Sequence, residues 1–104
     1  MTFPEAGERV RFSRPASRDF AELLSFTGRT WGEGQLDLIR HRILDALLII
    51  VKHPGIGRKL SGLGLPYRLY GVGAHNIVYQ AQDDVIRVIR ILHHRRDLKG
   101  QLRG

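Results

Sequence analysis

The segment from His75 to Asp97 constrains the fold more than any other part of the chain. Residues 85–92 read V-I-R-V-I-R-I-L, in which five of the eight residues are β-branched, and Asp83-Asp84 precedes them. Because β-branched side chains fit a strand better than a helix, these residues predict a strand that follows a turn. Apolar residues occupy both alternating sets, so both faces of this strand should be covered. We therefore expect a central strand.

The turn sets a register for the hairpin that residues 75–92 would form. With Asp83-Asp84 as a two-residue turn, the expected pairs are Tyr79 with Val88, Ile77 with Arg90, and His75 with Leu92. One face then holds Ile77, Tyr79, Ala81, Ile86, Val88 and Leu92 with His75, Arg90 and His94, and the other holds Asn76, Val78, Gln80, Val85, Arg87, Ile89, Ile91 and His93. The first face is more apolar and is expected under the helices, although a slip of one residue would exchange the faces.

Two helices are predicted upstream of this hairpin. A short strand over residues 8–13 leads into a helix capped by Ser13 or Arg14, with Pro15 in its first turn and its end near residues 28–30. A second helix runs from about Glu33 to His53, where Pro54-Gly55 stops it. The connection between them is short, so the helices must lie antiparallel, as a hairpin. Trp31 is expected to be a buried anchor at its corner.

A glycine-rich stretch, residues 54–66, follows the second helix. Gly57 and Gly62 have the spacing of a phosphate-binding loop, but Leu63-Gly64 stands where that loop needs Lys and Ser or Thr. We interpret it as an irregular crossover. Strands over residues 67–72 and 75–82 come next, which gives the order β-α-α-β-β-β. The predicted class is α+β, with an antiparallel sheet of about four strands covered on one face by the helical hairpin.

Charge is distributed unevenly along the 104 residues. Residues 46–104 hold ten Lys or Arg against three Asp, which accounts for the whole net charge of +7. This half should attract an acidic partner, either nucleic acid or an acidic peptide. The length suits a single domain over residues 1–104, with an ordered core over about 8–98 and a basic C-terminal tail over 98–104.

The absence of cysteine excludes disulfides, thiolate metal sites and cysteine nucleophiles. The longest apolar run, residues 46–51, is far shorter than the roughly 20 residues that a membrane span needs. The N-terminus has no apolar signal region. We expect a soluble cytoplasmic protein with no cofactor, no metal and no membrane partner.

Several pieces of the sequence together resemble a known family. They are R-F-S-R-P-A-S-R-D-F entering the first helix, W-G-E-G-Q-L at the corner, H-P-G-I-G-R after the second helix, Y-R-L-Y-G-V and H-N-I-V-Y in the strands, and I-R-V-I-R-I-L-H-H-R-R-D at the end. Over about residues 8–98 the chain resembles a ParE-type toxin of the RelE/ParE toxin–antitoxin superfamily. The resemblance implies that family's sheet and helical hairpin. It also implies a toxin encoded beside a ParD-like antitoxin, which should present an acidic, amphipathic segment.

The target of the toxin is open at this stage. ParE-type members are understood to poison DNA gyrase without catalysing a reaction, whereas RelE-type members cut messenger RNA on the ribosome. RNA cleavage needs a base, an acid and a cation at one phosphate, and the candidates are Tyr67, Arg68, His75, Tyr79, Arg90, His93, His94 and Arg95. Adjacent strand residues point to opposite faces, so His93 and His94 can share a site only if the strand has ended there. RelE-like patterns have a dense group of Lys and Arg on the middle strands, and here Tyr67-Arg68 is the only candidate pair there. This favours a gyrase inhibitor. A RelE-like ribonuclease is the alternative, and a third interpretation, a nucleic-acid-binding adaptor, rests on charge alone.

The candidate residues fall into three groups, and none is assigned as catalytic or as a metal ligand. The residues past the last strand exceed what a core needs, and they are predicted to contact the target: His93, Arg95, Arg96, Asp97 and Lys99. A second basic group is a possible antitoxin contact: Arg58, Lys59, Arg68 and Arg87. Structural roles are predicted for Trp31, for Tyr79, and for Arg90, which should pair with Asp19 or Glu22.

Overall fold

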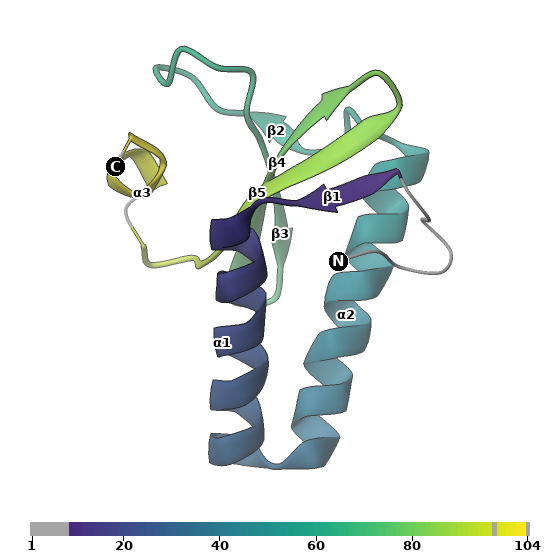
Figure 1. Cartoon of the computed structure of the whole chain (residues 1–104), viewed down its shortest axis with the longest axis vertical. Helices are drawn as coiled ribbons and strands as arrows, with labels where there is room; N and C mark the ends of the chain where they lie inside the picture. The colour runs from purple at the N-terminus through teal and green to yellow at the C-terminus, as the bar shows by residue number, and fades with distance from the viewer. Residues whose placement is uncertain (1–8, 97, 104) are drawn as a thin grey trace.

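The computed structural model describes residues 9–96 and 98–103. Its elements, in chain order, are β1 (Val10–Phe12), α1 (Arg14–Trp31), α2 (Glu33–Lys52), β2 (Arg58–Lys59), β3 (Arg68–Val72), β4 (His75–Gln82), β5 (Val85–His93) and α3 (Leu98–Arg103). Figure 1 shows α1 and α2 as an antiparallel hairpin whose open end meets the sheet and whose connected end points away from it. The predicted α+β class and helical hairpin are confirmed.

The sheet has five strands in the order β1-β5-β4-β3-β2. The prediction of about four strands, all antiparallel, is wrong in two respects. β1 pairs parallel to β5, and β2 adds a short antiparallel edge beside β3. The helical hairpin separates β1 from the other strands in the sequence. No turn therefore joins β1 to β5, and the sequence near β1 does not specify the direction in which the two strands pair. β2 has only two residues and lies inside the glycine-rich loop, where a strand pattern cannot be read.

The β4–β5 hairpin follows the predicted register only near its turn. Asp83 and Asp84 have φ angles of 52° and 62°, as a two-residue type I′ turn requires. Tyr79 pairs with Val88, as expected, but then Val78 pairs with Arg90 and His75 with His93. The pairs Ile77–Arg90 and His75–Leu92 are therefore wrong, because Ile89 is an extra residue in a β-bulge. Beyond the bulge the faces exchange, so Ile91 rather than Leu92 joins the core under the helices.

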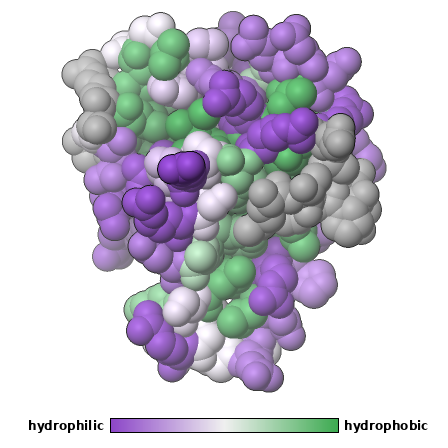
Figure 2. All heavy atoms as spheres, in the orientation of Figure 1, coloured by the Kyte–Doolittle hydropathy of each residue, from purple (hydrophilic) through white to green (hydrophobic). Residues whose placement is uncertain are grey.

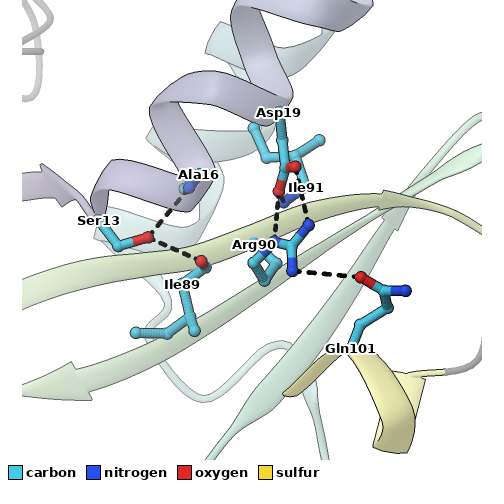
Figure 3. A network of polar contacts seen from close by, with 7 residues as sticks. All are labelled: Ser13, Ala16, Asp19, Ile89, Arg90, Ile91 and Gln101. Carbon is cyan, nitrogen blue, oxygen red and sulfur yellow. Dashed lines mark hydrogen bonds and ion pairs between the residues drawn. The ribbon is translucent and has the colours of Figure 1, made fainter. Parts of the chain in front are cut away.

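The bulge is also where α1 begins. The Ser13 amide donates to the Val88 carbonyl at 2.9 Å, and Ser13 Oγ donates to the Ile89 carbonyl at 2.8 Å. The same Oγ accepts from the Ala16 amide at 3.0 Å and so caps the helix, as Figure 3 shows. One serine thus joins the start of α1 to the carbonyl at the bulge of β5.

The main core lies between the sheet and the sheet-proximal half of the helical hairpin. It consists of Val10, Ala16, Phe20, Ile43, Ala46, Leu47, Ile50, Ile77, Tyr79, Ile86, Val88 and Ile91. Leu69, Val78 and Leu92 are also buried but stand apart from this cluster, and the register places Leu69 and Val78 on the other face. Leu98 of α3 lines a hollow there with Leu60 and Leu63. The tail predicted over residues 98–104 therefore contains a short helix, α3, whose apolar residues are half-buried.

The connected end of the helical hairpin extends past the core. Gly32 alone joins the helices, at φ 90° and ψ 175°, a conformation that is essentially restricted to glycine. Trp31 is 69% exposed, so its predicted role as a buried corner anchor is wrong. The buried residues of α1, Ala16 and Phe20, lie in its first two turns, whereas Leu23, Leu24 and Thr27 farther along the helix are only half-buried. None of the helices in residues 9–96 and 98–103 has the length and the apolar composition of a membrane-spanning helix.

Candidate functional site

A groove of about 500 Å³ lies between α1 and the ends of β4 and β5. Its lining residues are Asp19, Glu22, Leu23, Phe26, Thr27 and Trp31 from α1, with Ala74, His75, Ile91, Leu92, His93 and Arg96 opposite. We call it the strand-end groove. The α1 residues recur at intervals of three and four and so share one helical face. Phe26 is 56% exposed, and hydrophobic surface runs down the middle of the helical hairpin in Figure 2.

Three histidines gather where β5 ends. His75 and His93 are paired across β4 and β5, with ring centroids 5.4 Å apart and an interplanar angle of 85°. His94 stacks on His93 at 4.5 Å and 29°. Strand alternation stops at His93, so the condition under which His93 and His94 can share a site is met. We call these three residues the histidine cluster.

Hydrogen bonds define the state of two of the rings. His94 Nδ1 lies 2.9 Å from the Ala74 carbonyl, which can only accept, so this nitrogen carries a proton. The Arg95 amide donates to His93 Nδ1 at 3.2 Å, so that nitrogen is an acceptor and Nε2 carries the proton of the neutral ring. Within the described residues, no group of three or more acidic or histidine side chains is placed to hold a metal ion.

His75 differs from its neighbours. Its Nδ1 is buried and finds no hydrogen-bond partner in the described part of the chain. Burial, and then the positive charges that His93 and His94 can carry, lower the pKa of His75 below its usual 6.5. The neutral imidazole is therefore favoured, and an anion brought close to it would favour the charged form instead.

The residues predicted to contact the target have different positions. His93 and Arg96 line the strand-end groove, and Arg95 is exposed beside it. Asp97 lies outside the described residues. Lys99 falls within α3, and its side chain lies outside what the structure describes.

The second basic group does not form one patch. Arg58 and Lys59 are exposed on the edge strand β2, whereas Arg87 is exposed on β5, with β3 and β4 between. Arg68 is half-buried, and its Nη1 donates to the carbonyls of Gly57 at 2.7 Å and Gly55 at 3.2 Å. Arg68 therefore holds the loop after α2, and its hydrogen-bonding capacity is partly used by the fold.

Arg90 forms the ion pair that was expected for it. Its Nε donates to Asp19 Oδ2 at 2.7 Å and its Nη2 to Asp19 Oδ1 at 3.0 Å, a bidentate arrangement (Figure 3). Asp19 Oδ2 also accepts from the Ile91 amide at 3.0 Å, and Arg90 Nη1 donates to Gln101 at 3.3 Å. The hydrogen bonds to Asp19 raise the pKa of Arg90 still further. The pair joins α1 to β5 just past the bulge and reaches α3.

Tyr79 is fully buried, as expected for a core residue. Its hydroxyl donates to the Pro54 carbonyl at 2.8 Å and accepts from the Gly57 amide at 2.9 Å. Burial raises the pKa of Tyr79. A Cβ at Gly57 would lie 2.7 Å from the Tyr79 hydroxyl, which explains a glycine at that position. These contacts fix the start of the glycine-rich loop against the core.

The groove wall on α1 is the main feature that the sequence did not reveal. The spacing of apolar residues predicts a face of the first helix with Leu23 and Thr27, and this face does not include Phe26. The available signal was a second stripe, with Phe26 three residues after Leu23 and four after Glu22. Gln101 was also missed, because its contact with Arg90 depends on how α3 folds back.

The chain is similar to toxins of type II toxin–antitoxin systems. A family model described as the ParE toxin of the type II toxin–antitoxin system parDE matches residues 10–98. The chain therefore belongs to the ParE toxin family. It is 27% identical over 92 residues to Toxin ParE1 of Caulobacter vibrioides, a match that covers 88% of this chain and 95% of that protein.

A solved structure described as the chromosomal ParDE system from P. aeruginosa has a similar fold. The TM-score is 0.67 at 16% identity, and the match covers 81% of this chain and 92% of that one. The predicted family is confirmed, and membership of a ParDE system implies an antitoxin partner.

Proposed function

We propose that this ParE toxin inhibits DNA gyrase by binding to it, without itself catalysing a reaction. Membership of the family supports this, and one structural observation carries it. Three of the strand residues that an RNA-cleaving site could use are engaged inside the fold. Arg68 donates to two loop carbonyls, Tyr79 is buried between Pro54 and Gly57, and Arg90 is paired with Asp19. Gyrase is a cytoplasmic enzyme, so we propose action in the cytoplasm.

The proposed contact with the target lies at the end of β5. His93 is half-buried, and Arg95 and Arg96 are exposed on a turn whose backbone amides donate to His93. Cationic side chains on such a turn can bind an acidic surface. Asp97 and Lys99 stay part of this proposed contact.

We propose that the antitoxin neutralises the toxin by placing an amphipathic segment in the strand-end groove. The groove offers an apolar wall that includes Leu23, Phe26 and Trp31, and it ends at the cationic Arg96. A helix with apolar residues on one face and acidic residues near one end would complement both features. Such a segment would cover His93 and Arg96 and so compete with the target.

A supercoiling assay with purified gyrase tests this function. Adding the toxin should stop supercoiling, and adding the product of the neighbouring antitoxin gene should restore it. The RelE-like alternative would have to use the histidine cluster with Arg95, because Arg68, Tyr79 and Arg90 are engaged in contacts within the fold. Unimpaired supercoiling together with codon-dependent cleavage of messenger RNA on ribosomes would therefore contradict the proposal.

A further inference from the structure

The end of the strand-end groove has a charge that depends on its histidines. The ionisable side chains in its lining are Asp19, Glu22, His75, His93 and Arg96. Asp19 is paired with Arg90, which stands outside the lining. The charges of Glu22 and Arg96 are opposite and cancel. An incoming side chain therefore meets little net charge when both imidazoles are neutral, and a positive charge when either one is protonated.

In the part of the chain that the structure describes, no carboxylate near His75 is bonded to the histidine cluster. The charged and titratable groups facing it are Asp19 and Glu22 from α1, Arg42 from α2, His93 from β5, and His94 and Arg96 from the turn that follows. The hydrogen-bond partners of the His93 and His94 rings are a backbone amide and a carbonyl. Neither ring is bonded to a carboxylate of the described residues, and His75 Nδ1 is buried without a partner. Within the described residues, a protonated cluster thus has no carboxylate bonded to it.

We propose that this end of the groove is a receptor for a carboxylate side chain of the antitoxin, and that the histidine cluster takes up a proton when that carboxylate binds. The inference rests on the proposed neutralisation by an antitoxin. His93 Nε2 carries the proton of the neutral ring and can donate to the carboxylate, and the Arg96 guanidinium supplies a charge-assisted donor beside it. The bound anion offsets the cost of charging the half-buried His75.

Proton uptake of this kind gives binding a defined pH dependence. For one proton taken up, the dissociation constant falls by at most about tenfold per unit of pH decrease. At a pH low enough to protonate the cluster in the free toxin, binding takes up no further proton, and the dissociation constant no longer changes with pH. Because the antitoxin carboxylate must stay ionised, the window lies above the range in which Asp and Glu titrate, which is near about 4.

Titration calorimetry of the toxin with the purified antitoxin tests the proposal. The measurements are made at pH 6, 7 and 8, and at pH 7 in two buffers of different ionisation enthalpy, so that proton uptake is counted directly. The variants are His93→Gln and His75→Asn. His53→Gln is the matched control, because His53 is exposed at the end of α2, outside the groove. Circular dichroism of each variant reports folding. His93→Gln should disturb the fold less than His75→Asn, because His93 is partly exposed whereas His75 Nδ1 is buried.

Binding should tighten about tenfold or more from pH 8 to pH 6, with net proton uptake at pH 7. His93→Gln or His75→Asn should reduce this dependence, and His53→Gln should keep it. A dissociation constant that is independent of pH, or an unchanged slope in both cluster variants, would overturn the carboxylate receptor and leave the neutralisation proposal standing. Failure of the antitoxin to bind at every pH would overturn both.

Discussion

The two ends of the β4–β5 hairpin are built for different purposes. At the turn end, Tyr79 and Val88 pair as the sequence predicts, both are fully buried, and the Tyr79 hydroxyl makes two hydrogen bonds. At the other end, past the bulge at Ile89, three imidazoles crowd together beside two exposed arginines. Folding accounts for the first arrangement. It does not account for the second, where a buried nitrogen has no partner among the described residues.

Removal of Tyr79 should have the largest effect on stability. Tyr79→Ala empties a fully buried site, so the free energy of unfolding should fall by about 3 to 5 kcal/mol. Tyr79→Phe removes only the bonds to Pro54 and Gly57 and should cost about 1 to 3 kcal/mol. Urea denaturation measures both. A loss below about 1 kcal/mol for the alanine variant would show that the turn end is not the structural half of the hairpin.

Disruption of the Asp19–Arg90 pair should have the second largest effect on stability. Asp19→Asn removes the bidentate contact and leaves a mostly buried guanidinium with fewer partners, so stability should fall by about 2 to 3 kcal/mol. The exposed pair of Asp37 and Arg40 on α2 provides a control, and Asp37→Asn should cost less than about 0.5 kcal/mol. Equal losses in the two variants would contradict a special role for the pair beside the bulge.

The stability of the toxin alone should depend on pH through His75. Its pKa is lowered in the folded state, so the unfolded state binds the proton more readily. This contribution is fully present above the usual value of 6.5, and it is lost as the pH falls through the lowered pKa. The melting temperature should therefore decrease below pH 6.5, and His75→Asn should flatten that decrease. A melting temperature that rises on acidification in the same window would contradict the burial of a neutral imidazole.

Trp31→Ala should change stability least. The ring is 69% exposed, so the cost should be below about 0.5 kcal/mol. If the ring is part of the antitoxin site, binding should weaken by about tenfold or more, as aromatic contacts at interfaces do. Calorimetric titration with the antitoxin measures this, and Trp31→Phe is the control, which should retain most of the affinity. Unchanged binding in Trp31→Ala would remove Trp31 from the site.

Periodicity and turn chemistry gave most of the fold, because these signals are local. The helix limits, the strand over residues 85–92 and the Asp83-Asp84 turn follow from spacing, capping and β-branching. The bulge at Ile89 has no local signal in the sequence, and the side chain that donates to the Ile89 carbonyl, Ser13, is 76 residues away. The parallel β1 and the contact of Gln101 with Arg90 are likewise tertiary.

The candidate site was predictable only in part, for the same reason. The density of charged residues indicated the segment after β5 as part of the site. The opposite wall of the strand-end groove is formed by α1, and charge density did not indicate it. Trp31 was misplaced because an aromatic at a helical corner usually packs, and here the corner projects beyond the sheet. Which residues share a groove therefore depends on how far the helical hairpin extends past its core.

Supercoiling by gyrase in the presence of charge-reversed toxins tests the central claim most directly. Arg95→Glu with Arg96→Glu changes the strand end, and Arg58→Glu with Lys59→Glu makes the same change of charge on the exposed β2. The strand-end variant should lose inhibition while its melting temperature stays near that of the unchanged toxin, and the β2 variant should still inhibit. Full inhibition by the strand-end variant, or equal loss in both, would contradict a target contact at the end of β5.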